Sequence, residues 1–189
     1  MIQVRLAAPR RAARVTGLIL GAALVRAWLL PLGDLFSTIV FAGCLLAITW
    51  FERPTATTEP RWGRGRALAA GLMVGAILLA PVVSGPLSAR PVSLFWPWAV
   101  IAALIATLEE TSVRGVLYQR LEGEAGTAAA IVVGAAVFAL IHLPRYGLSA
   151  MPLDSAVGLA LGGLRALTGR VWPCAVAHTV ADWGAWFWA

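Results

Sequence analysis

The chain has 189 residues, 60% of them hydrophobic and only 13% charged, and its formal net charge at pH 7 is +6. A soluble domain carries about twice that charged fraction, so the composition argues against a soluble protein and indicates an integral membrane protein. The positive charge does not indicate a nucleic-acid partner, because the arginines lie near helix ends instead of on one polar face.

Apolar runs separated by turn signals predict an all-α fold, a polytopic membrane helix bundle of about seven transmembrane helices. The turns are marked by proline, glycine or clustered polar residues, such as the stretch from Gly123 to Gly126. No soluble domain fits between the helices. In chain order, we expect helices over residues 14–31, 35–51, 66–83, 94–120, 126–143, 153–167 and 172–188.

The arginines at helix ends orient this bundle. With seven helices, most of them fall on one side of the membrane, and only Arg90 and Arg145 lie on the other. Because basic residues concentrate on the cytoplasmic side, we expect the N-terminus in the cytoplasm and the C-terminus outside.

Pairs of glycines four residues apart allow neighbouring helices to approach closely. We expect these pairs to serve packing within the monomer, and the sequence indicates no oligomeric state. The pairs are Gly17/Gly21, Gly71/Gly75 and Gly158/Gly162.

Two adjacent acids, Glu109 and Glu110, lie inside an apolar stretch. Neighbouring residues on a helix point about 100° apart, so the two carboxylates serve different faces. Glu110 precedes Arg114 by four residues, which predicts an ion pair with a structural role. Glu109 has no local partner, and an unpaired carboxylate in an apolar site can act as a general base. The alternative is that both acids pair with arginines elsewhere, for which Arg26 is the spare interior candidate.

Both histidines of the chain have a partner four residues away. His142 follows Phe138, and His178 precedes Asp182. Each histidine taken alone is more often a packed helix residue than a catalyst. Together with Glu109, however, His142 can bind and deprotonate a water. Asp182 can accept a hydrogen bond from one nitrogen of His178, leaving the other to stabilise an oxyanion.

Depth along the helices tests whether these groups can meet. At about 1.5 Å per residue, Glu109, His178 and Asp182 lie roughly 16, 9 and 15 Å from the cytoplasmic ends of their helices. His142 lies higher, roughly 25 Å from the start of its helix. A tilted helix, or one that starts deeper, would lower His142, so we expect the four residues to share one cavity.

Three short sequences, EETSVR (109–114), FALIH (138–142) and HTVAD (178–182), occur in this order in the second half of the chain. They resemble the EExxxR, FxxxH and HxxxN/D motifs of the CPBP family, the CAAX proteases and bacteriocin-processing intramembrane proteases. The resemblance implies an endopeptidase that hydrolyses a peptide bond of a membrane-associated protein or peptide. It divides the chain into three preceding helices, residues 1–93, and a catalytic core, residues 94–189.

The resemblance also implies roles for individual residues. Glu109 and His142 correspond to the pair that activates water, and His178 with position 182 to the oxyanion hole. The remaining motif residues support the site; these are Glu110, Arg114 and Phe138. Asp182 departs from the asparagine of the eukaryotic CAAX enzymes. Because an ionised Asp182 would repel an oxyanion, it must orient His178 or stay protonated.

Cofactors and location follow from the same resemblance. Two histidines and an acid could hold zinc, and the family is often labelled as metalloproteases, but no HExxH motif is present. The resemblance favours a glutamate-activated water without a metal or other cofactor. It also implies a multi-pass protein of a cell membrane, in the setting of a bacterial inner membrane, with membrane lipid as a partner.

Two other classes of function remain open at this point. A non-catalytic membrane scaffold, or a bacteriocin-immunity protein of the same fold, would keep the polar core without hydrolysis. A proton-coupled transporter would also explain a buried glutamate and histidines, but it usually shows inverted repeats, and no repeat is apparent.

Overall fold

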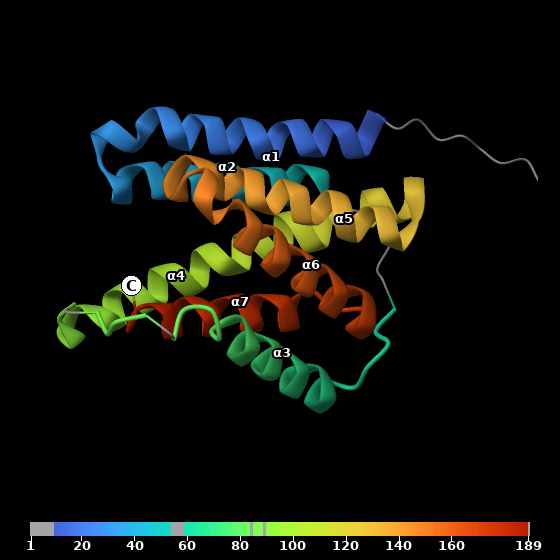
Figure 1. Cartoon of the computed structure of the whole chain (residues 1–189). Helices are drawn as coiled ribbons and strands as arrows, with labels where there is room; N and C mark the ends of the chain where they lie inside the picture. Colours follow the sequence, from blue (N-terminus) through green and yellow to red (C-terminus); the bar gives the residue numbers. More distant parts are fainter. Residues whose placement is uncertain (1–9, 54–58, 84, 89, 189) are drawn as a thin grey trace, which may run out of the picture.

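Helices make up the regular structure of the residues that this computed structural model describes, which are 10–53, 59–83, 85–88 and 90–188 (Figure 1). The all-α prediction is confirmed. A π-helical segment, Thr111–Leu117, joins α4 to α5 without a turn. The α-helices are α1 (Arg10–Leu29), α2 (Asp34–Glu52), α3 (Arg64–Leu78), α4 (Phe95–Glu110), α5 (Tyr118–Tyr146), α6 (Met151–Thr168) and α7 (Trp172–Ala185).

One predicted break takes a different form in the structure. The turn expected at Gly123–Gly126 is a kink within α5, where Gly126 departs from helical geometry with φ 85° and ψ 171°. Positive φ costs glycine little, so the chain changes direction there without a loop. The kink separates residues 118–125, which continue the π-helical segment, from residues 127–146, which carry the FALIH motif.

Three helical stretches among the described residues are long and apolar enough to cross a membrane: Arg11–Leu32, Asp34–Glu52 and Val92–Tyr146. The last has 55 residues and contains the kink at Gly126. By contrast, α3 has 15 residues and α7 has 14, fewer than the about 20 that a full span requires. Large apolar side chains face outward, which is typical of a surface that contacts lipid.

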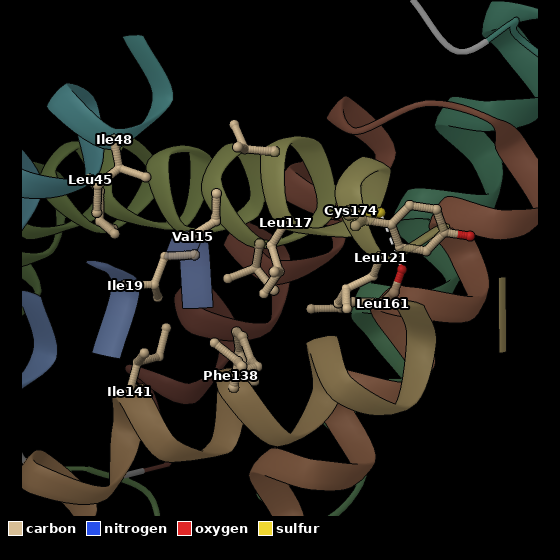
Figure 2. Close-up of a cluster of buried hydrophobic side chains, with 14 of the residues drawn as sticks. Val15, Ile19, Leu45, Ile48, Leu117, Leu121, Phe138, Ile141, Leu161 and Cys174 are labelled. Atoms are coloured by element: carbon tan, nitrogen blue, oxygen red, sulfur yellow. Dashed lines mark hydrogen bonds between the residues drawn. The ribbon is translucent and has the colours of Figure 1, made fainter. Parts of the chain in front are cut away.

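The core is formed by residues that the sequence places far apart. Figure 2 shows Val15 and Ile19 of α1 between Leu45 of α2 and Ile141 of α5. Buried positions recur along α1 every three or four residues, so one face of this helix points into the bundle. In Figure 1, α4 runs obliquely between the layer that contains α1 and α2 and the layer that contains α3 and α7.

Close packing through glycine is confirmed for two of the three predicted pairs. A Cβ atom on Gly75 of α3 would lie 2.7 Å from the carbonyl oxygen of Ala177 in α7, and one on Gly158 of α6 would lie 2.7 Å from the Cα of Ala135 in α5. Gly71 and Gly162 are similarly close to a neighbouring helix. The prediction is wrong for Gly17/Gly21, because no atom of the described residues lies within 4 Å of a Cβ at either position.

Candidate active site

The site is centred on Glu109, in the last turn of α4, whose side chain is almost completely buried. Its Oε2 lies 3.7 Å from Nε2 of His142 on α5 and 3.9 Å from Nε2 of His178 on α7. Three helices therefore each contribute one group, as the sequence predicted. One ligand atom from each residue lies within 4.8 Å of the others.

His142 reaches this centre despite the height expected for a straight, upright helix. The kink at Gly126 changes the direction of α5, and α4 crosses the bundle obliquely (Figure 1). A height estimated from the number of residues to the helix end assumes a straight, upright helix, and neither α4 nor α5 is one. The expectation that tilt would bring His142 level with Glu109 agrees with the 3.7 Å separation of their side chains.

The adjacent acid Glu110 faces in another direction and is completely buried with Arg114. Glu110 Oε1 accepts a hydrogen bond of 2.8 Å from Arg114 Nη1, which is the predicted ion pair. Arg114 Nη2 also donates to the carbonyl oxygen of Gly158 on α6. Its guanidinium lies over the ring of Phe138, 4.4 Å from the ring centre. Phe138 thus has a packing role, since its ring also contacts His178.

These two acids are followed immediately by the π-helical segment, which the sequence did not predict. A π-helical turn contains one residue more than an α-helical turn, and such turns are frequent at functional sites. Within this segment, the Thr111 hydroxyl donates to the carbonyl oxygen of Thr107, and the Ser112 hydroxyl donates to that of Leu45 on α2. Neither contact has a signal in the local sequence pattern.

The protonation of His142 follows from its backbone contact. Its Nδ1 lies 2.8 Å from the carbonyl oxygen of Phe138. A carbonyl oxygen can only accept, so Nδ1 carries a proton, and a neutral His142 presents the lone pair of Nε2 to Glu109. Two acceptors 3.7 Å apart do not bond to each other, but a water between them can donate to both.

The orientation of His178 differs from the one expected. The residue within hydrogen-bond distance is Glu110, whose Oε1 lies 3.1 Å from Nδ1 of His178. Asp182 Oδ2 lies 3.8 Å from the other ring nitrogen, Nε2, which is too far for a hydrogen bond. Glu110 therefore holds both Arg114 and His178 through the same oxygen. If Nε2 also donates, His178 is an imidazolium, with Glu109 and Asp182 as further counter-charges.

Two residues that the sequence analysis did not select also lie near the centre. Asp154, in the first turn of α6, has a buried Oδ2 that no group of the described chain reaches by hydrogen bond, and it acts electrostatically on His142. Tyr146 stacks on His142, with ring centres 5.8 Å apart. An acid in the first turn of a helix is ordinarily explained by the helix dipole, so Asp154 carried no distinguishing signal.

The side chains at the centre of the site are also of the types that bind a metal ion. Glu109, His142 and His178 are the ligand types of a three-residue zinc site. In a tetrahedral site with bonds of about 2.1 Å, two ligand atoms lie about 3.4 Å apart. The observed separations of 3.7 and 3.9 Å lie between this value and the about 4.4 Å that a water with two hydrogen bonds of about 2.8 Å would give, so the three residues fit either a metal ion or a bound water.

Fold and site together define the class of this protein. Its described residues are all-α, several of its helices are apolar enough to cross a membrane, and the bundle brings a carboxylate and two imidazoles together. Residues 91–184 match the family model of the type II CAAX prenyl endopeptidases, described as Rce1-like. This part of the chain contains all three motifs and belongs to that family, which confirms the resemblance. Neither the comparison with curated proteins nor that with solved structures found a match.

Proposed function

We propose that this protein is an intramembrane endopeptidase that hydrolyses a peptide bond of a membrane-associated protein or peptide. The observation that carries the proposal is the position of Glu109 Oε2, 3.7 and 3.9 Å from two imidazole nitrogens, within the segment that belongs to the Rce1-like family. This spacing is compatible with a water held between Glu109 and His142, and the proposal assigns the activation of that water to Glu109 without a metal.

In the proposed reaction, Glu109 takes a proton from this water while the water oxygen attacks the scissile carbonyl carbon. His142 orients the water through the lone pair of Nε2. The electron pair of the carbonyl π bond moves to oxygen, where the Nε2–H of an imidazolium His178 stabilises the negative charge. The C–N bond then breaks, and Glu109 returns its proton to the leaving nitrogen.

The other motif residues have supporting roles in this proposal. Glu110 fixes the ring of His178, and Arg114 neutralises Glu110 and anchors it to α6 through Gly158. We assign Asp182 the role of a counter-charge for the imidazolium, since its separation from Nε2 excludes a direct hydrogen bond. Phe138 supports the site by packing against Arg114 and His178.

We also propose an arrangement in the membrane. Seven spans result if α1, α2, α3, α6 and α7 each count once and the kink at Gly126 divides the long α4–α5 stretch into two. The short helices α3 and α7 would lie in a locally thin bilayer or be covered by longer neighbours. Residues 94–189 form the catalytic core behind three preceding helices, and the N-terminus faces the cytoplasm of a bacterial cell.

The decisive experiment uses the purified full chain in detergent with a library of membrane-associated peptides, and mass spectrometry identifies the products. We expect Glu109→Gln and His142→Ala to lose cleavage while keeping the wild-type unfolding temperature. The exposed Glu59→Gln serves as the matched control and keeps full activity. Cleavage retained in both site variants would overturn the mechanism.

A metal-independent mechanism also predicts that 1,10-phenanthroline leaves the rate unchanged. Activity lost to the chelator and restored by zinc would show that Glu109, His142 and His178 hold a metal. A scaffold or immunity protein of the same fold would instead retain its cellular phenotype when Glu109 is replaced by alanine.

A further inference from the structure

A buried arginine lies beside the site on a helix that contributes none of the three motifs. Arg26 of α1 is only 6% exposed. Its Nη2 donates a 3.2 Å hydrogen bond to the hydroxyl of Thr38 on α2, and its guanidinium lies 5.0 Å from the ring centre of Phe41. Its Nε is buried and has no hydrogen-bond partner in the described part of the chain. No carboxylate of these residues lies within ion-pair distance of it.

The position of Arg26 follows from the inward face of α1. Val15 and Ile19 on this face pack near Ile141 of α5 (Figure 2). Arg26 follows Ile19 by seven residues, about two helical turns, and is buried like it. The hydrogen bond to Thr38, near the start of α2, holds its guanidinium at the α1–α2 end of the bundle, where Glu109 is close enough to act on it electrostatically. Arg26 therefore lies between the catalytic centre and the end of the bundle where the α1–α2 connection meets the end of α5.

That end of the bundle is closed by an ion pair, in which Arg145 Nη1 lies 2.8 Å from Asp34 Oδ1. Arg145 thus neutralises Asp34, and Asp34 forms no ion pair with Arg26. A charged side chain inside a membrane protein is costly and ordinarily faces a pathway or a partner group. A guanidinium offers five N–H donors in a planar fork that matches a carboxylate. In the described part of the chain, the guanidinium of Arg26 has two partners, the hydroxyl of Thr38 and the ring of Phe41.

We propose that Arg26 binds a carboxylate of the peptide substrate, positioned between the scissile bond and the α1–α2 connection. The proposal rests on the peptidase function proposed above and adds a specificity-determining residue to it. The carboxylate has two possible sources, the C-terminus of the peptide or an acidic side chain. If Arg26 only stabilised Glu109, its replacement would slow every peptide equally, and this difference makes the proposal testable.

The experiment uses apolar peptides synthesised in matched pairs, each with a C-terminal carboxylate or a C-terminal amide, and a second set with an internal Asp or Asn. We measure kcat/KM for the wild-type chain, Arg26→Gln and Arg26→Lys. A charge-assisted hydrogen bond predicts that the wild type prefers the carboxylate member of one set by about 10- to 100-fold. Arg26→Gln should cleave both members at the rate of the neutral one, while Arg26→Lys keeps part of the preference. The set that shows the preference identifies the source.

A matched control is Arg14→Gln, on the same helix, because the Arg14 side chain is 62% exposed and pairs with Glu52. We expect it to keep the wild-type preference. The unfolding temperature of each variant shows whether the fold is intact. Equal cleavage of both members by the wild type, or an equal loss for both in Arg26→Gln, would overturn the assignment.

Binding separates this proposal from the proposed hydrolysis. In the Glu109→Gln background, fluorescently labelled peptides of the same pairs should bind at least about tenfold more tightly as the carboxylate, and adding Arg26→Gln should remove the difference. If the wild-type chain cleaves no peptide but this Arg26-dependent preference in binding persists, the peptidase function fails and the carboxylate site stands. If the preference is absent in both variants, the carboxylate site fails.

Discussion

At the residue scale, the neighbours Glu109 and Glu110 show how adjacent identical side chains acquire different roles. Glu110 is completely buried, accepts a hydrogen bond from Arg114 and lies at hydrogen-bond distance from His178. Glu109 faces two imidazole nitrogens at distances beyond direct bonding. The sequence predicted this division from helix geometry alone, because a step of about 100° per residue cannot place both carboxylates on one face.

The first prediction concerns stability. Arg114→Gln leaves Glu110 as a buried carboxylate without its arginine, and breaking a buried ion pair costs about 3–5 kcal/mol of unfolding free energy. Glu109→Gln should change it by less than about 1 kcal/mol, because no arginine of the described chain lies within ion-pair distance of Glu109. Chemical unfolding in mixed micelles measures the unfolding free energy of each variant. Similar losses in the two variants would contradict the distinction between the two acids.

The second prediction concerns Asp182, which lies 3.8 Å from His178 Nε2 and is not hydrogen-bonded to it. Asp182→Asn should retain cleavage, because an amide N–H can help to stabilise the oxyanion that a carboxylate would repel. His178→Ala should lower kcat by about 100- to 1000-fold, the effect of losing one oxyanion donor. Steady-state kinetics compare the two variants. If Asp182→Asn is as inactive as Glu109→Gln, Asp182 takes part in proton transfer.

At the scale of elements, the positions of the helices were predictable and the departures from regular geometry were not. Apolar runs and turn residues located each helix, since these signals are local. The π-helical segment Thr111–Leu117 depends on contacts with other helices, such as the bond from Ser112 to α2, and these do not appear in a local pattern. The cluster GEAG at 123–126 resembled a turn, but only Gly126 changes direction.

The third prediction tests the contact between α3 and α7. Gly75→Ala would place a Cβ 2.7 Å from the carbonyl oxygen of Ala177, next to His178. Overpacking of this kind costs about 1–3 kcal/mol of unfolding free energy, and it should also lower activity by displacing His178. Gly17→Ala, with open space at its Cβ, should be neutral or stabilising by up to about 1 kcal/mol. Thermal unfolding measures the stability of both variants. Equal unfolding temperatures for Gly75→Ala and Gly17→Ala would contradict the close contact between α3 and α7.

At the scale of the whole molecule, the motifs predicted which residues form the candidate site better than they predicted the residues around it. The three motifs lie on α4, the π-helical segment, α5 and α7, and the structure brings their residues together. Arg26 of α1 and Asp154 of α6, which belong to no motif, act electrostatically on residues of this site. Which residues of other helices reach a site depends on helix crossing and tilt, and these are set by the complete packing arrangement rather than by a local pattern.

The fourth prediction concerns orientation in the membrane. With Cys44 and Cys174 replaced, single cysteines at the exposed positions Glu59 and Ser93 should lie on opposite sides of the bilayer. The positive-inside rule places position 59 in the cytoplasm and position 93 outside. A membrane-impermeant maleimide should therefore label Ser93→Cys in intact cells and Glu59→Cys only after lysis. The reverse pattern would show an inverted protein, and labelling of both in intact cells would contradict seven spans.

One oxygen atom, Glu110 Oε1, lies at bonding distance from both the arginine of the first motif and the histidine of the third. This shared oxygen makes Glu110, Arg114 and His178 depend on one another structurally, although His178 is distant in the sequence from the other two. A substitution at any one of them removes a reason for selection to preserve the other two. Among relatives, these three positions should change together, and lineages that lose His178 should be those that lose the Glu110–Arg114 pair.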